Sequence, residues 1–125
     1  MQKIHTDKAP AAIGPYSQAI VHGDLVFTSG QIPINPESGN IDAEGITAQT
    51  EQVMKNLGAV LSEAGASFES AIKTTCFLSD MSDFAAFNEV YARYFTEKPA
   101  RSCVAVKTLP KNVLVEVEVI AEIVN

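Results

Sequence analysis

The chain has 125 residues, and 9 Lys and Arg against 15 Asp and Glu give it a formal net charge of −6 at pH 7. Hydrophobic residues make up 46% of the sequence and charged residues 19%, which is typical of a folded globular domain and excludes a disordered chain. The acidic balance argues against a nucleic-acid partner, because Lys and Arg contacts to phosphates supply most of that affinity.

We expect no secretory signal at the start of the chain. Residues 1–10 (MQKIHTDKAP) lack the apolar stretch of a signal peptide, and no run approaches the roughly eighteen apolar residues that span a membrane. We therefore expect a cytoplasmic protein without membrane contact, in which Cys76 and Cys103 are reduced thiols. No linker interrupts the sequence, so we expect residues 1–125 to form a single domain.

The first part of the chain is predicted to be rich in strands. Residues 2–6 form a short expected strand, and a loop with two prolines follows. Two apolar, β-branched stretches at 17–23 and 24–32 predict a hairpin, because Gly23-Asp24 between them suits a tight turn. The next thirteen residues, from Pro33, are dense in turn formers and predict a loop or a small ribbon.

An amphipathic helix is predicted after this loop. From Thr47 onward apolar residues recur at the i, i+3, i+4, i+7 spacing of one buried helix face, namely Val53, Met54, Leu57, Val60, Leu61 and Ala64. Thr47 is the expected N-cap and Gly65 the expected terminator. Residues 70–80 are rich in β-branched and aromatic side chains and predict a strand.

The second half ends with a helix and two strands. Asp80 or Ser82 can cap a helix whose aromatic stripe runs until Pro99 stops it, and the stripe comprises Phe84, Phe87, Val90, Tyr91, Tyr94 and Phe95. Residues 101–109 and 114–124 are strand-length runs. The order βββ-α-β-α-ββ predicts an α+β domain in which both helices cover one face of a mixed sheet.

Along the last two predicted strands, side chains point alternately to the two faces of the sheet, and valines gather on one face. We expect them to pair antiparallel across the intervening turn, with their valines beneath the helices. Arg101, Cys103, Glu116 and Glu118 would then share the opposite face. A sheet with helices on one side often covers its other side with a second subunit, so we expect this face to lie in an interface.

Arg101 and Glu116 are the strongest candidates for chemistry. Arg101 follows Pro99-Ala100 at the start of a strand, and a guanidinium holds a carboxylate through two parallel hydrogen bonds. The alternative is a structural ion pair of Arg101 with Glu116 or Glu118. Partial desolvation would let Glu116 position or deprotonate a water, whereas the alternative for Glu116 is a strand carboxylate facing solvent.

Cys103 lies two residues after Arg101, where a cation lowers the pKa of a thiol. A nucleophilic cysteine also needs a base, and His5 and His22 lie in other segments, so a Cys–His dyad has no local support. Neither histidine has metal-ligand spacing with a cysteine, and we expect no metal site.

Tyr16 and Ser29 lie where side chains commonly edge a pocket, the first after Gly14-Pro15 and the second at a predicted strand end. No GxSxG or phosphate-binding loop accompanies them. On their own these residues also fit an interpretation as turn residues.

Five separated segments carry a family resemblance: APAAIGPYSQA, FTSGQIP, KTTCFLSDMSDFAAFNEVY, PARSCVAV and LPKNVLVEVEVIA. With these segments in this order over nearly its whole length, the chain closely resembles the Rid (reactive intermediate deaminase, YjgF-type) family, 2-iminobutanoate/2-iminopropanoate deaminase branch.

The resemblance implies a chorismate-mutase-like α+β fold that assembles as a homotrimer with a pocket at each subunit interface. It also implies an enzyme that hydrolyses 2-iminopropanoate and 2-iminobutanoate to 2-oxo acids and ammonia without a cofactor. Such an enzyme protects pyridoxal-phosphate enzymes from damage by 2-aminoacrylate.

The resemblance assigns roles by motif. Arg101 matches the arginine that binds the substrate carboxylate, and Glu116 matches the carboxylate that positions the attacking water. Tyr16, Ser29 and Cys103 match residues that line the pocket, with the backbone of Cys103 mattering more than its thiol. Many relatives have Glu in place of Ala105 and a longer loop before Pro99, so the physiological imine stays open.

A second class of function also fits the resemblance. Related trimers have been described as ligand-sensing regulators and as ribonuclease-like translation inhibitors, and a pocket around Arg101 would bind a small carboxylate without turnover. The acidic charge and the lack of a basic stripe interleaved with aromatic residues make the RNA version the weaker alternative.

Overall fold

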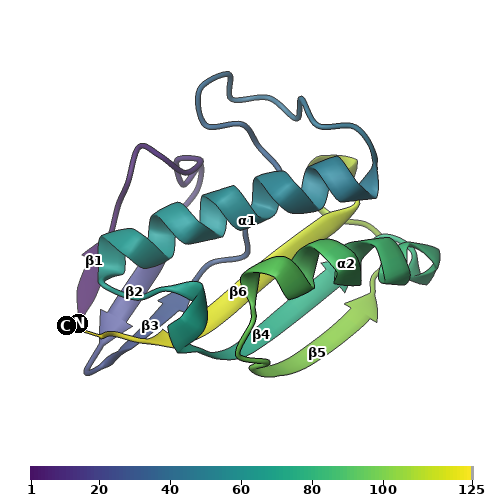
Figure 1. The fold of residues 1–125 in the computed structure, drawn as a ribbon. Helices are drawn as coiled ribbons and strands as arrows, with labels where there is room; N and C mark the ends of the chain where they lie inside the picture. Colours follow the sequence, from purple (N-terminus) through teal and green to yellow (C-terminus); the bar gives the residue numbers. More distant parts are fainter. Residues whose placement is uncertain (125) are drawn as a thin grey trace.

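Six strands form one mixed sheet, and both helices cover the same face of it (Figure 1). The computed structural model describes residues 1–124. The elements are β1 (Gln2–Ile4), β2 (Ala19–His22), β3 (Leu25–Thr28), α1 (Gly45–Ala64), β4 (Ala71–Leu78), α2 (Phe84–Tyr94), β5 (Ala100–Ala105) and β6 (Val115–Glu122). Short 3₁₀ turns precede β4, α2 and β6 at η1 (Phe68–Ser70), η2 (Met81–Asp83) and η3 (Pro110–Asn112). The predicted α+β class and element order are confirmed.

The N-terminal hairpin forms as predicted. β2 and β3 pair antiparallel with His22 opposite Leu25, so Gly23 and Asp24 make a two-residue turn. Gly23 has a φ of 61°, a value that a residue without a Cβ adopts at little cost. The first strand is shorter than predicted and ends at Ile4, because the backbone N–H of Thr6 is bound by the side chain of Gln18 instead of a strand.

The first helix begins three residues before the predicted start. Thr47 lies inside α1, so the prediction that it caps the helix is wrong, and the N-cap position belongs to Glu44. The left-handed Gly65, with a φ of 85°, ends the helix as predicted. Its N–H donates to the carbonyl of Ser62 at 3.1 Å, while Ala66 N–H donates to that of Leu61 at 2.8 Å. These bonds satisfy carbonyls that the helix leaves free.

The second helix is preceded by a capped turn. The side chain of Asp80 accepts a hydrogen bond from Ser82 N–H at 2.8 Å, which caps η2 and leads the chain into α2. The helix ends at Tyr94, well before Pro99, and the buried Phe95 follows it. The predicted stop at Pro99 is therefore too late.

The core lies between the sheet and the two helices. One face of α1 packs on the inward residues of β6, and the aromatic stripe of α2 packs beside α1 in the same core, as their spacing predicted. The fully buried residues include Val53, Leu57, Leu61, Phe87, Val115 and Val117. Burying a side chain of this size contributes about 1.5–3 kcal/mol each, so this layer supplies much of the stability.

The prediction that the last two strands pair is wrong. β4 lies between them, pairing antiparallel with β6 and parallel with β5, and β5 is the edge of the sheet. The short link between β5 and β6, which contains η3, therefore crosses over one strand instead of forming a hairpin.

This topology also changes which residues share a face. Arg101 is in register with the buried Thr74, and Cys103 with the buried Cys76, so both lie on the helix face of β5. Glu116 and Glu118 lie on the opposite face, in register with other residues of β4. The prediction of one polar face that holds all four residues is therefore wrong.

The face without helices is called the open sheet face below, and it carries Phe27, Phe77, Val104, Glu116 and Glu118. It combines exposed apolar side chains with carboxylates, since Phe27 and Val104 are both exposed. Within residues 1–124, neither helix has the length and hydropathy of a membrane span.

Candidate active site

A cavity of about 510 Å³ opens beside the start of β6. Its walls come from the loop before β2, the segment that follows β3, the η3 turn, and Glu116. The lining residues are Pro10, Ala11, Ile13, Tyr16, Gln18, Ser29, Gly30, Gln31, Ile32, Ile34, Pro110, Lys111 and Glu116. The structure thus brings together three of the predicted site residues, Tyr16, Ser29 and Glu116.

Glu116 lies directly against Gly30. A Cβ on residue 30 would overlap Oε2 of Glu116 and lie 2.8 Å from its Cδ. The two segments are held together by Gln31 and Val117, whose backbone groups exchange hydrogen bonds of 2.8 and 3.2 Å. Glycine at position 30 is therefore what allows the carboxylate to lie in the cavity wall.

The environment of Glu116 favours its neutral form. Burial raises the pKa of the Glu116 carboxyl, and the nearby charge of Glu118 raises it further. A carboxyl with a raised pKa accepts and returns a proton more readily near neutral pH than an ordinary glutamate.

Ser29 and Tyr16 reach the cavity from neighbouring segments. Ser29 Oγ donates a hydrogen bond of 2.6 Å to the carbonyl of Ser17, so its lone pairs stay available to accept one from a ligand. Tyr16 follows a tight turn in which its N–H donates to the carbonyl of Gly14 at 2.8 Å. With 53% of its surface exposed, Tyr16 forms an open part of the rim.

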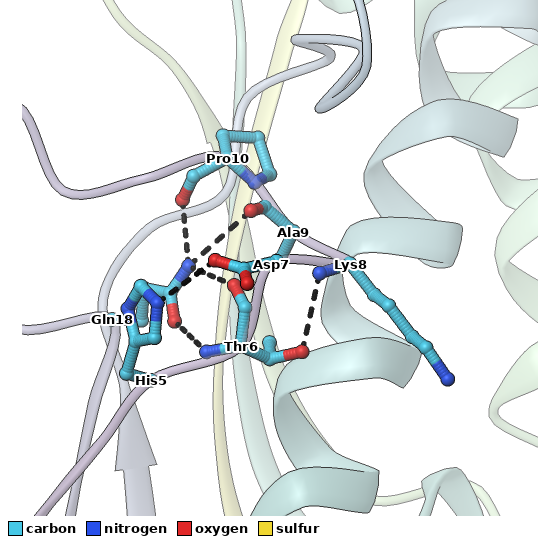
Figure 2. Close-up of polar contacts among 7 residues, drawn as sticks. All are labelled: His5, Thr6, Asp7, Lys8, Ala9, Pro10 and Gln18. Carbon is cyan, nitrogen blue, oxygen red and sulfur yellow. Dashed lines mark hydrogen bonds and ion pairs between the residues drawn. The ribbon is translucent and has the colours of Figure 1, made fainter.

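Gln18 fixes the loop that forms one wall. Figure 2 shows its side chain bound to the backbone of three residues, Thr6, Ala9 and Pro10. Gln18 Oε1 accepts from Thr6 N–H at 2.7 Å, while Nε2 donates to the carbonyls of Thr6 at 3.0 Å and Pro10 at 2.8 Å. Each of these backbone groups gains a partner that no strand supplies.

Gly30, Gln18 and Lys111 also line this cavity, and none of them is among the site residues predicted from the sequence. The glycine after Ser29 was a visible signal, because a glycine at a strand end often marks a close approach by another group. Gln18 carried no local signal, since its partners lie 8 to 12 residues earlier. Lys111, which has a left-handed backbone with a φ of 56°, lies in a turn and looked like an ordinary surface lysine.

Arg101 lies outside this cavity. It lines a separate hollow of about 280 Å³ at the edge of the sheet, together with residues of α2 and of the segment that precedes β5. Its Nη1 donates to Oδ1 of Asn88 at 2.7 Å. The guanidinium carbon also lies 4.8 Å from the ring centre of Tyr91 and 5.5 Å from that of Phe84.

The structural ion pair considered for Arg101 does not form within the described part of the chain. The salt bridges between residues 1–124 join His5 with Asp7 and Arg93 with Glu51. Arg101 cannot reach Glu116 because the two side chains lie on opposite faces of the sheet. The predicted site residues therefore lie in two separate places on the chain.

Cys103 is partly buried on the helix face near Arg101. Burial raises the pKa of its thiol, and the opposing effect of Arg101 is smaller. Arg101 therefore lowers this pKa as expected, but burial outweighs its effect, and the thiol is not activated as a nucleophile.

No group of three or more His, Cys, Asp or Glu side chains in residues 1–124 is placed to hold a metal ion. His5 instead contacts the exposed Asp7, with 3.0 Å between its Nε2 and Oδ1 of the aspartate.

Comparison with known proteins gives one family model. The model described as "Endoribonuclease L-PSP" matches residues 6–123.

Individual relatives match over most of their length. The chain is 54% identical over 124 residues to the protein named "Putative regulator AldR" of Lactococcus lactis, covering 98% of both. It is 50% identical to "Reactive Intermediate Deaminase A, chloroplastic" of Arabidopsis thaliana, covering 94% of this chain and 64% of that protein. The crystal structure of E. coli TdcF with bound serine has the same fold, with a TM-score of 0.92, 45% identity and 98% of both chains covered.

Proposed function

The chain belongs to the endoribonuclease L-PSP family, also called the Rid or YjgF family, and from this premise we propose that it hydrolyses 2-imino acids to 2-oxo acids and ammonia. The proposed substrates are 2-iminopropanoate and 2-iminobutanoate. As part of the same proposal, the protein acts in the cytoplasm without a cofactor and protects pyridoxal-phosphate enzymes from 2-aminoacrylate.

The observation that carries the proposal is the placement of Glu116. Its carboxyl lies against Gly30 in the wall of a cavity large enough for a small organic acid, and burial raises its pKa. A group with this pKa and this location suits general acid–base catalysis. The relative named as a reactive intermediate deaminase supports the same chemistry.

The proposal requires a second copy of the chain. Arg101 and Glu116 point away from opposite faces of one sheet, so they cannot contact the same small molecule within one protomer. Arg101 lies on β5, an edge strand, beside a hollow that is open to the outside. We propose that this edge packs against the Glu116 cavity of a neighbour, which closes a homotrimer with three composite sites.

The proposed reaction needs few groups because a protonated imine carbon is already electrophilic. Arg101 of one copy holds the substrate carboxylate through two parallel hydrogen bonds. Glu116 of the other copy takes a proton from a water as the water oxygen attacks the imine carbon and the C=N electron pair moves to nitrogen. Glu116 then returns the proton to that nitrogen. The carboxylate next takes the hydroxyl proton as the C–N bond breaks and the C=O bond forms, and ammonia leaves.

The pocket residues have supporting roles in this proposal. Ser29 Oγ can accept a hydrogen bond from the N–H of the protonated substrate imine because its own proton is donated to the carbonyl of Ser17. Tyr16 covers the open rim, and Cys103 contributes its backbone beside Arg101.

A regulatory function is the second candidate. The relative at 54% identity is named a putative regulator, and the E. coli TdcF structure contains bound serine. Both fit a trimer that binds a small amino or organic acid without turnover. The ribonuclease version is disfavoured, because a net charge of −6 opposes phosphate binding.

A coupled assay separates these candidates. A pyridoxal-phosphate dehydratase supplied with serine or threonine generates the imine, and release of the 2-oxo acid is followed with and without the protein. The proposal predicts release faster than spontaneous hydrolysis, and loss of that acceleration in Glu116→Gln. A folded wild-type protein that binds the carboxylate but gives no acceleration would favour the regulatory function.

A further inference from the structure

The guanidinium of Arg101, a partly buried residue on an edge strand, has neutral neighbours. Within residues 1–124 its side-chain hydrogen bond goes to the neutral amide oxygen of Asn88, at 2.7 Å, and no carboxylate lies within salt-bridge distance. Two aromatic rings, Phe84 and Tyr91, lie beside it. The positive charge is therefore oriented but not neutralised.

Helix α2 supplies all three of these neighbours from one face. Phe84, Asn88 and Tyr91 are spaced at i, i+4 and i+7, which places them in one row along the helix. The same row faces the hollow, since Asn88 and Tyr91 line it together with Arg101. One rigid element thus sets the position of the whole guanidinium.

The row itself is anchored in the core. The hydroxyl of Tyr91 shares a hydrogen bond of 2.7 Å with Oγ1 of the fully buried Thr74. Its ring stacks on Phe95 with 4.5 Å between the ring centres. Because Thr74 is also the register partner of Arg101, this hydrogen bond ties the helix to the strand next to Arg101.

From these contacts we infer that Asn88 is a positioning residue for Arg101, a role that rests on the proposed function. Its amide oxygen fixes the plane of the guanidinium by occupying one N–H, and the other N–H groups stay free for an anionic ligand. A carboxylate at position 88 would also orient the arginine, but it would pair with its charge. The site therefore needs an acceptor that is neutral, and asparagine provides one at the right length.

The decisive variant is Asn88→Asp, which keeps the acceptor oxygen and adds one negative charge. Titration calorimetry with 2-oxobutanoate measures carboxylate binding without any turnover. We expect Asn88→Asp to bind it on the order of tenfold or more weakly, because a carboxylate next to the guanidinium competes with the ligand for the same charge. The thermal midpoint should stay the same or rise, since the new pair is favourable in the empty protein.

The matched control is Asn40→Asp. It makes the same chemical change in an exposed turn between β3 and α1 that lines neither cavity, so it lowers the net charge equally. We expect wild-type affinity and wild-type kinetics from this control. A general effect of charge would instead weaken binding in both variants and would overturn the inference.

Kinetics distinguish orientation from charge. Asn88→Asp weakens ground-state and transition-state binding alike, so KM should rise while kcat changes little. Asn88→Ala leaves the charge of Arg101 free but removes the group that fixes its plane, so kcat should fall with a smaller change in KM. A merely structural asparagine would lower the thermal midpoint in both variants and would not separate KM from kcat.

The outcomes also separate this inference from the proposed function. If wild type binds 2-oxobutanoate and Asn88→Asp binds it equally well, the role of Asn88 is wrong while the carboxylate site stands. If neither wild type nor Asn40→Asp binds the oxo acid or accelerates imine hydrolysis, the proposed function fails and the inference fails with it.

Discussion

Oε2 of Glu116 occupies the space that a Cβ on Gly30 would need. The residue that is proposed to move protons and the residue that makes room for it come from segments 86 positions apart, joined by the backbone bonds between Gln31 and Val117. The backbone of Gly30 is not in the left-handed region, so alanine can adopt it without strain. Position 30 therefore tests the location of the carboxylate separately from its chemistry.

The first prediction concerns Gly30→Ala. The added methyl group should push Glu116 out of the cavity wall and lower kcat/KM for imine hydrolysis by about 10-fold to 100-fold, since small misplacements of a catalytic group carry costs of this order. Gly58→Ala is the control, because it adds the same group in α1 at 3.2 Å from Phe68. The control should change the thermal midpoint and leave kcat/KM alone. Equal activity of wild type and Gly30→Ala would remove Glu116 from the mechanism.

The second prediction concerns Arg101→Lys. The charge is kept but the two parallel hydrogen bonds are lost, so kcat/KM should fall by about 100-fold or more, on the order of 3 kcal/mol of transition-state stabilisation. The thermal midpoint should change little, because no carboxylate within residues 1–124 pairs with Arg101. Arg93→Lys is the control, since Arg93 contacts Glu51 at 3.0 Å away from both hollows. A large loss of stability with activity retained would make Arg101 a structural residue.

The third prediction concerns assembly. The proposed trimer should give a mass near three times 13.4 kDa by light scattering. Val104 is 48% exposed on the open sheet face and should become buried in the trimer interface. Val104→Glu would place a charge in that interface, so the variant should be monomeric and should show no turnover. Met81→Glu places the same charge on another exposed apolar residue, in η2 off the sheet, and should leave the mass unchanged. A wild-type protein that is monomeric at micromolar concentration rules out the composite site.

The fourth prediction concerns alkaline pH. Burial raises the pKa of the Cys76 thiol from 9.0 to about 12, so the folded state holds this proton more tightly than the unfolded state. The free energy of unfolding should therefore fall as the pH rises from about 9 towards about 12, because the unfolded chain releases the proton first. Cys76→Val removes the titrating thiol while filling a similar volume. Urea titrations of both proteins should show a steeper decline for wild type, and parallel curves would contradict the shift.

The local sequence pattern predicted the helices and strands of this fold well. It did not predict the order of the strands in the sheet, which depends on contacts between distant segments. The alternation along β6 correctly placed Val115, Val117 and Val119 in the core. The same argument failed for β5, because Val104 looked like a core residue and Arg101 like a surface one. In the structure the guanidinium of Arg101 lies over the rings of Phe84 and Tyr91 in α2, and Val104 is exposed on the edge strand.

The candidate site also has parts that the sequence predicts and parts that it does not. Arg101 and Glu116 could be singled out from their motifs, and Glu116 lies in a cavity. That the two face apart within one chain could not be predicted, because it depends on β4 lying between β5 and β6. Gly30 and Gln18 act through partners distant in sequence, which no local window contains.

The hydrogen bonds of Gln18 have a consequence for the energetics of ligand capture. Segments without a strand partner usually fluctuate. When a ligand orders such a segment, the loss of conformational entropy weakens binding. Here one buried amide already holds the backbone of Thr6 and Pro10, so the wall leading to Tyr16 is rigid before any ligand arrives. A small acid has few atoms and forms few contacts with the protein. Because the wall is ordered in advance, less of the free energy of these contacts is lost to ordering the protein, and the affinity is higher.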